Sequence, residues 1–205
     1  MTSPYLKIAA GLLVSVCIMP THAIDMAAAS QVDPSAVPII KQSNLKLYVT
    51  AAEVFEMKRA DSKILLIDVR TPEELQYVGS ADEVMDANIP YLVNDTSEYD
   101  PKLKHYRLEP NSDFATAIAS IVEKHGLAQN NATLILMCRS GDRSAKAANL
   151  LAKVGYKKVY SVIDGFEGDK ATDGAMKGKR TVNGWKNANL PWSYNMPKEK
   201  LYFRF

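Results

Sequence analysis

One short segment of this 205-residue chain combines a nucleophile with fixed positive charge. Cys138 follows an apolar run, residues 134–137, that has the character of a buried strand. The segment after it reads Arg139, Ser140, Gly141, Asp142, Arg143 and Ser144. Loop amides at the start of a helix can converge on an anion, and Arg139 and Arg143 add fork-shaped donors. Gly141 permits a tight turn, and the combined positive field favours the thiolate of Cys138 over the thiol.

Cys138 admits two interpretations. A cysteine that ends a buried strand is often a small, inert core residue. A purely structural cysteine, however, would not account for the basic loop that follows it, so we favour a reactive thiol. Activation by the loop needs no histidine, and a dyad with His105 lacks support in the sequence. Asp142 places a negative charge in this loop, where it either points outward to cap the helix or weakens binding of dianions.

The first 23 residues have the pattern of an export signal. Lys7 supplies a positive charge, residues 8–19 are almost wholly apolar, and a small-residue cleavage site follows. We therefore expect an exported protein, periplasmic in a Gram-negative bacterium, with no membrane attachment after the signal is cleaved. Cleavage would remove Cys17, which would leave Cys138 as the only thiol in an oxidising compartment.

Length and composition favour one globular domain with appendages. The formal net charge of +2 and the lack of a basic stripe interleaved with aromatics argue against a nucleic-acid partner. The sequence contains no Cys-x-x-Cys motif, no histidine cluster and no phosphate-binding glycine loop. We therefore expect no metal and no cofactor.

Strand and helix patterns alternate along the chain. Strands are predicted at 45–49, 63–69, 88–91, 133–137 and 159–163, and helices at 50–58, from Thr71, at 114–125 and at 144–154. This alternation favours an α/β fold with a mainly parallel sheet covered on both faces. Ligands of such sheets bind at the carboxyl ends of strands, which is where Cys138 lies.

The predicted organisation is a linker at 24–43, a domain at 44–195 and a carboxyl-terminal tail at 196–205. Residues 92–111 and 168–183 are predicted to be insertions, the first of them irregular. Three apolar side chains near the end suggest that the last part of the domain folds back onto the core; they are Trp185, Leu190 and Trp192. The packed side of the 144–154 helix is predicted to include Ala145, Leu150, Leu151 and Val154.

The loop from Cys138 to Ser144, followed by an alanine-rich helix, resembles the active-site loop of the single-domain rhodaneses. The segment from Asp68 to Leu75 is similar to that family's strand-to-helix segment, and Asn88-Ile89-Pro90 matches a further landmark, as does the Gly155, Val159, Gly165 spacing. The resemblance covers about residues 44–193. It implies a three-layer fold with a central, mainly parallel five-stranded sheet flanked by helices.

The resemblance also implies sulfur transfer through a persulfide on Cys138. Backbone amides from Arg139 to Arg143 would hold the persulfide and the anionic end of the donor, and Arg143 and Ser144 would shape the loop. Asp68 and Arg70 would brace it. The expected partners are a small sulfur donor such as thiosulfate and a thiol or cyanide acceptor, while a protein partner is not identified.

Two other functions are compatible with the sequence. Related folds use a Cys-to-Arg loop for phosphatase or arsenate reductase chemistry, but their loops have five intervening residues, whereas four separate Cys138 from Arg143. A binding or sulfur-delivery module is the second alternative, because many domains that resemble rhodaneses have lost catalysis. A basic set near the carboxyl end could dock an acidic partner or form a solvated loop: Lys170, Lys177, Lys179, Arg180 and Lys186. Residues 79–86 depart from the family's usual pattern at this position, which puts the pocket walls in question.

Overall fold

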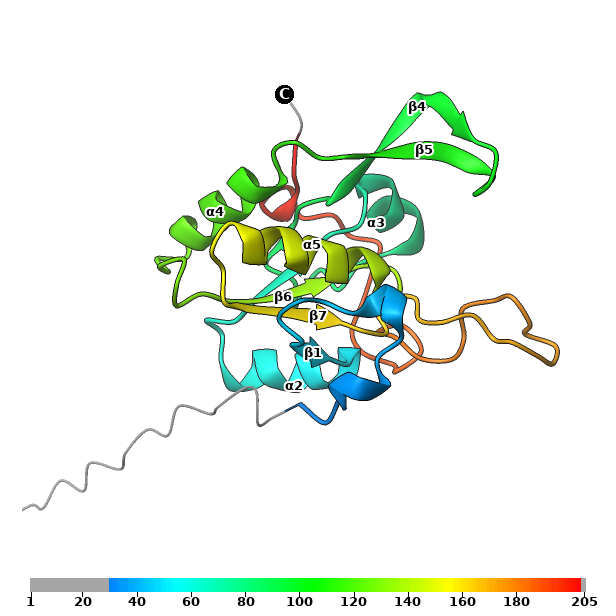
Figure 1. Cartoon of the computed structure of the whole chain (residues 1–205), viewed down its shortest axis with the longest axis horizontal. Coiled ribbons are helices and arrows are strands. Elements are labelled where there is room, and N and C mark those ends of the chain that lie inside the picture. Colours follow the sequence, from blue (N-terminus) through cyan, green and yellow to red (C-terminus); the bar gives the residue numbers. More distant parts are fainter. Residues whose placement is uncertain (1–29, 204–205) are drawn as a thin grey trace, which may run out of the picture.

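Five parallel strands form the central sheet, in the order β1-β7-β6-β2-β3 (Figure 1). The computed structural model describes residues 30–203, so the predicted export signal and Cys17 lie outside the described residues. The strands are β1 (Tyr48–Val49), β2 (Leu65–Asp68), β3 (Ala87–Asn88), β6 (Thr133–Met137) and β7 (Lys158–Val162). The mainly parallel sheet predicted from the alternating pattern is confirmed, as are the five strands that the resemblance implies.

Four helices connect these strands. They are α2 (Ala51–Ala60), α3 (Pro72–Val78), α4 (Phe114–Lys124) and α5 (Asp142–Lys153). Helices α2 and α3 begin after Thr50 and Thr71, as the sequence predicts. Both starts are capping boxes, in which the threonine side chain accepts a hydrogen bond from the amide three residues later. Helix α5 begins at Asp142, two residues before the predicted start at Ser144, and Gly141 occupies its cap position.

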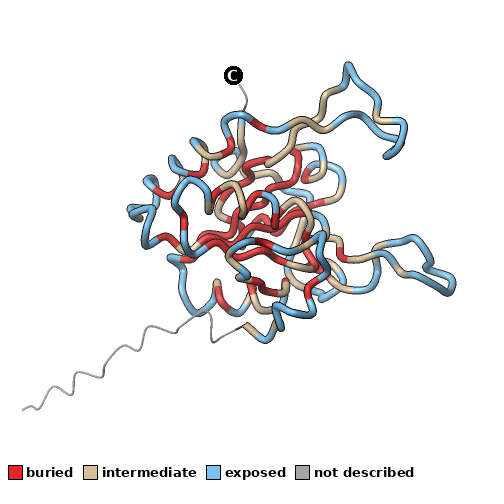
Figure 2. The backbone as a smooth tube through the Cα atoms, viewed as in Figure 1, coloured by how far each residue is buried: buried red, intermediate tan, exposed pale blue. Residues whose placement is uncertain are grey.

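Alternate residues of the central strands pack on opposite faces of the sheet. Leu134, Leu136 and Cys138 contribute to a core shared with α4 and α5, whereas Ile135 and Met137 contribute to a core shared with α2. Figure 2 shows that the buried residues gather along these strands in the middle of the molecule. The alternation therefore places Cys138 on the α5 side of the sheet.

The carboxyl-terminal part of the chain folds back onto the α2 side, as predicted. Trp185 is fully buried, and Leu190 and Trp192 pack against the same core. The packed side of α5 is predicted correctly except at Val154, which is 48% exposed. Val154 follows the last turn of the helix, so its side chain is carried away from the packed stripe.

The prediction that 92–111 is irregular is wrong. These residues form an antiparallel hairpin of β4 (Leu92–Asp100) and β5 (His105–Pro110), which extends away from the sheet in Figure 1. Both strands are largely exposed, so neither has the one-sided apolar pattern by which a strand is recognised in a sequence. Backbone pairing holds the hairpin instead, with Tyr99 opposite Tyr106 in the register.

The described part of the predicted 24–43 linker, residues 30–43, lies against the domain. It contains the short 3₁₀ turns η1 (Pro34–Ala36) and η2 (Ile39–Lys41), and Val37 within it is buried. The tail contains a third such turn, η3 (Lys198–Lys200). Within residues 30–203, no helix has both the length and the apolar composition needed to cross a bilayer.

Candidate active site

Cys138 follows the last residue of β6, at the carboxyl edge of the sheet, and α5 begins four residues later. The loop turns back on itself so that the amide of Gly141 donates a hydrogen bond to the Cys138 Sγ, at 3.1 Å. The amino end of α5 adds its partial positive charge on the same side. The loop therefore directs a backbone amide and the amino end of a helix toward this sulfur.

Two serine hydroxyls continue the hydrogen-bond network that begins at the sulfur. The Cys138 thiol lies 3.5 Å from the Ser144 Oγ and can donate to it, and Ser144 in turn donates to the Gly141 carbonyl at 3.1 Å. Ser161, in the neighbouring strand β7, lies 2.9 Å from the Ser144 Oγ. Sequence reasoning placed Ser144 at the site and missed Ser161, whose signal is a lone serine in an otherwise apolar strand.

The loop conformation depends on glycines. Gly141 has φ +99°, a region that L side chains rarely occupy, and a Cβ there would lie 2.4 Å from the Ile163 carbonyl oxygen. Gly165 has φ +63° and passes under the loop, where a Cβ would lie 2.5 Å from the carbonyl oxygen of Cys138. The next residue, Phe166, donates its amide to that same carbonyl at 2.8 Å. The turn after β7 thus supports the Cys138 loop from below.

Arg143 is held by a carboxylate from another element. Its two terminal nitrogens donate to the two oxygens of Glu74, both at 2.6 Å, and Glu74 also accepts the amide of Thr71 at the start of α3. Burial lowers the pKa of Arg143, but the hydrogen bonds and charge of Glu74 outweigh it, and the net pKa is raised. Arg143 therefore fixes the loop to α3, and its fork is not free to bind a substrate.

Asp68 and Arg70 lie beneath the loop and are completely buried. Asp68 accepts hydrogen bonds from the Arg70 amide and from its Nε, both at 3.0 Å, and forms an ion pair with its terminal nitrogen at 2.6 Å. The Arg70 guanidinium lies 3.9 Å from the centre of the Phe166 ring. The predicted bracing of the loop by this pair is thus indirect and passes through Phe166.

The remaining loop residues differ in exposure. Arg139 is exposed and Ser140 is half-buried. Asp142, in the first turn of α5, pairs with Lys146 at 2.8 Å, so part of its negative charge is offset outside the cradle. His105 lies exposed in the hairpin strand β5, and none of its contacts within residues 30–203 is with Cys138.

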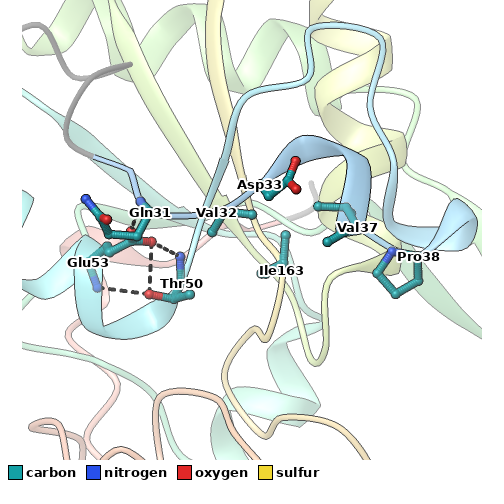
Figure 3. Close-up of a pocket in the computed structure, with 9 residues that line it drawn as sticks. Gln31, Val32, Asp33, Val37, Pro38, Thr50, Glu53 and Ile163 are labelled. Carbon is teal, nitrogen blue, oxygen red and sulfur yellow. Dashed lines mark hydrogen bonds between the residues drawn. The ribbon is translucent and has the colours of Figure 1, made fainter.

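A shallow cavity of about 520 Å³ lies between residues 31–38, the start of α2 and Ile163 (Figure 3). Two of its polar residues, Thr50 and Glu53, are already engaged in the capping box of α2. Cys138 is not among the residues that line it, so the cavity is separate from the site described above. In the part of the chain that the structure describes, no grouping of histidine, cysteine and acidic residues is suited to a metal ion.

A parallel α/β domain with a cysteine loop at the carboxyl edge of its sheet is the class that this fold and site define. The family described as Rhodanese-like domain matches residues 50–172, and the chain belongs to that family. The match contains β2, α3 and the whole loop from Cys138 to Ser144.

Individual proteins similar to this chain agree with that assignment. An uncharacterized RP600 homolog from Rickettsia rickettsii is 32% identical over 146 residues, which cover 71% of this chain and 96% of the relative. Thiosulfate sulfurtransferase 18 from Arabidopsis thaliana is 32% identical over 123 residues, covering 57% of this chain and 78% of the relative. The crystal structure of Rv0390 from M. tuberculosis has a TM-score of 0.51 at 25% identity and covers 71% of this chain and 96% of that one.

The Glu74–Arg143 pair leads to a prediction about stability. Burial raises the pKa of Glu74, but the hydrogen bonds and charge of Arg143 outweigh it, so the net pKa lies below the ordinary value of 4.5. The Glu74→Gln variant should therefore lose about 1–3 kcal/mol of unfolding free energy at neutral pH. Because the pKa is lowered in the folded state, the contribution is complete above the unfolded value and is lost as the pH falls through the folded value.

Urea unfolding of wild type and Glu74→Gln between pH 3 and 8 measures this difference, which should be constant near neutrality and shrink in acid. Glu73→Gln is the matched control, because the neighbouring Glu73 is exposed and its side chain accepts a hydrogen bond only from the half-buried Asn94. That change should cost less than about 0.5 kcal/mol. A difference between wild type and Glu74→Gln that persists unchanged at pH 3 would contradict the electrostatic origin of the effect.

Proposed function

We propose that this protein is a sulfurtransferase of the thiosulfate type, which carries sulfane sulfur as a persulfide on Cys138. The observation that carries the proposal is the Gly141 amide 3.1 Å from the Cys138 Sγ, at the amino end of α5. Membership of the rhodanese-like family and similarity to a protein named as a thiosulfate sulfurtransferase support it. The chemistry is nucleophilic and covalent.

In the first step the Cys138 thiolate attacks the outer sulfur of thiosulfate. A sulfur–sulfur bond forms on Cys138 while the sulfur–sulfur bond of the donor breaks, and its electron pair leaves with sulfite. In the second step a thiolate or cyanide attacks the outer sulfur of the persulfide. The Cys138 thiolate is regenerated, and the acceptor leaves as a persulfide or as thiocyanate.

The loop suits this chemistry in two ways. The Gly141 amide and the helix dipole stabilise negative charge at the position where the persulfide must be held. Only 1% of the surface of Cys138 is exposed, so a donor must reach the sulfur through a narrow approach. A small donor such as thiosulfate meets that requirement better than a bulky one.

We infer from the leader pattern alone that the protein works after export. Its sulfur donor and acceptor would then be compounds of the periplasm. The Cys138 thiol would be kept there because it reacts, and its burial would limit unwanted oxidation.

Intact-mass measurement of the purified protein before and after thiosulfate tests the proposal. We expect the gain of one sulfur atom on Cys138 and its loss when cyanide is added, with thiocyanate as the product. The same spectrum reports the amino terminus, and a chain that begins near residue 24 would support export. A protein that gains no sulfur from thiosulfate or an alkyl persulfide would overturn the assignment as a sulfurtransferase and favour a binding role.

A further inference from the structure

The segment 168–183 begins next to the Cys138 loop and is hydrogen-bonded to it. The amide of Glu167, directly before the segment, and the amide of Gly168, its first residue, donate to the Arg139 carbonyl at 3.0 and 3.2 Å. Figure 1 shows the segment, in orange, projecting from the end of the sheet toward which the arrows of β6 and β7 point. The hydrogen bond from Gly168 therefore joins the segment to Arg139, the residue that follows Cys138.

The side chain of Arg180, near the end of this segment, contacts the first residue of the segment. Its terminal nitrogen donates to the Gly168 carbonyl at 2.5 Å, and its backbone pairs with Lys170. The Asn183 side chain accepts the Asp169 amide at 2.8 Å, which closes the base of the segment. The guanidinium of Arg180 is therefore held at the base of the segment, next to the Cys138 loop, and is kept away from the exposed tip.

Arg139 and Arg180 are close enough to influence each other. Burial lowers the pKa of Arg180, and the positive charge of Arg139 lowers it further, whereas Glu167, Asp169 and the Cys138 thiolate act in the opposite direction. Arg139 is exposed, and its side chain makes no hydrogen bond or ion pair among residues 30–203. Two cations thus stand near the sulfur without a shared counterion between them.

The acidic groups nearby do not cancel this charge. Asp169 is bound by Lys41, whose ammonium lies 2.7 Å from its carboxylate. The negative charge of Glu167 is shared between two cations, because it interacts with Lys186 as well as with Arg180. The net charge of the side chains around Arg139 and Arg180 is therefore positive. Arg143, which the sequence suggested for the substrate, is instead paired with Glu74.

We propose that Arg139 and Arg180 together bind the anionic end of the sulfur donor, and that Arg180 is a specificity-determining residue supplied by the segment 168–183. The inference rests on the proposed sulfur transfer at Cys138 and adds a residue that selects among sulfur donors. Arg180 would favour donors whose leaving group is an oxyanion of sulfur, as sulfite is for thiosulfate, over donors without one. Two guanidinium forks match the oxygens of such a group, and the bound sulfite departs with the electron pair of the broken sulfur–sulfur bond.

Kinetics with two donors test the assignment. One is thiosulfate, and the other is a small alkyl persulfide that has no oxyanion. Arg180→Gln should raise KM for thiosulfate about tenfold or more and change kcat/KM for the alkyl persulfide by less than about threefold. Arg180→Lys should fall between Arg180→Gln and wild type. Lys179→Gln is the matched control, because Lys179 is exposed and makes only backbone hydrogen bonds, and it should behave as wild type.

A second readout does not depend on turnover. Sulfate should slow alkylation of Cys138 by iodoacetamide in wild type, and this protection should weaken at least about fivefold in Arg180→Gln and in Arg139→Gln. Arg139→Gln removes no hydrogen bond or ion pair within residues 30–203, so it keeps the test valid if Arg180→Gln folds poorly.

The possible failures can be told apart. Equal losses with both donors would overturn the assignment and give Arg180 a structural role, and an unchanged KM would exclude it from the donor site. If wild type accepts sulfur from neither donor, the proposed function fails. Sulfate protection that still depends on Arg139 and Arg180 would then support the anion site by itself, and its absence would overturn that as well.

Discussion

The Cys138→Ser variant is expected to gain no sulfur from thiosulfate and to lose turnover by at least about a thousandfold. A serine hydroxyl is a far weaker nucleophile at neutral pH than a thiolate, and the oxygen cannot form the sulfur–sulfur bond on which the cycle depends. The loop would still offer the Gly141 amide, but only to a neutral hydroxyl. Intact mass and thiocyanate formation measure the two losses.

Stability separates this chemical effect from misfolding. Serine and cysteine have similar shapes, and the serine hydroxyl at position 138 would find the Gly141 amide and the Ser144 hydroxyl as partners. The melting temperature of Cys138→Ser should therefore remain close to that of wild type. A sulfur adduct on the variant, or turnover near the wild-type level, would show that Cys138 is not the sulfur carrier.

The site could be predicted from the sequence because its central features are local. The apolar run before Cys138 specifies a strand, the polar loop specifies a turn into a helix, and the alternation of strands and helices places that turn at a ligand-binding edge. The same locality made the helix starts at Thr50 and Thr71 predictable, since each capping interaction joins residues three apart.

The partners of the loop could not be predicted, because they are distant in sequence. Glu74 lies in the first turn of α3, and nothing local shows that it reaches across to Arg143. Ser161 and Phe166 meet the loop only because β7 lies beside β6 in the sheet. Each of these contacts is a consequence of strand order, which the alternating pattern leaves open.

The hairpin and the segment 168–183 show the limit of pattern recognition in another way. Both are mostly exposed, so burial imposes no apolar period on them. Their structure comes from backbone pairing, in the hairpin between β4 and β5 and in the segment between Lys170 and Arg180. The position of Arg180 follows from that pairing, which explains why the sequence showed only a basic stretch.

The second large effect is expected for Gly141→Ala. Gly141 has φ +99°, and an added Cβ would lie 2.4 Å from the Ile163 carbonyl oxygen, which itself accepts the Lys41 ammonium at 2.9 Å. The nearest atoms belong to the Ile163 backbone, which cannot rotate aside, so the loop must move away from the residue that follows β7. We expect a loss of at least about 2 kcal/mol of unfolding free energy, since positive φ and the clash both oppose the alanine.

The same movement should withdraw the Gly141 amide from the Cys138 Sγ. Loss of one donor that stabilises developing negative charge lowers rates by about a hundredfold or more, and we expect that decrease in the rate of persulfide formation. Gly126→Ala is the matched control, because Gly126 also has a positive φ, of +67°, but nothing lies within 4 Å of the added Cβ. The control should be destabilised by about 1 kcal/mol and load sulfur at the wild-type rate. Urea unfolding and stopped-flow loading with thiosulfate measure the two quantities. Wild-type loading by Gly141→Ala would show that the amide at position 141 does not stabilise the sulfur, and the electrostatic role would then rest on the α5 dipole.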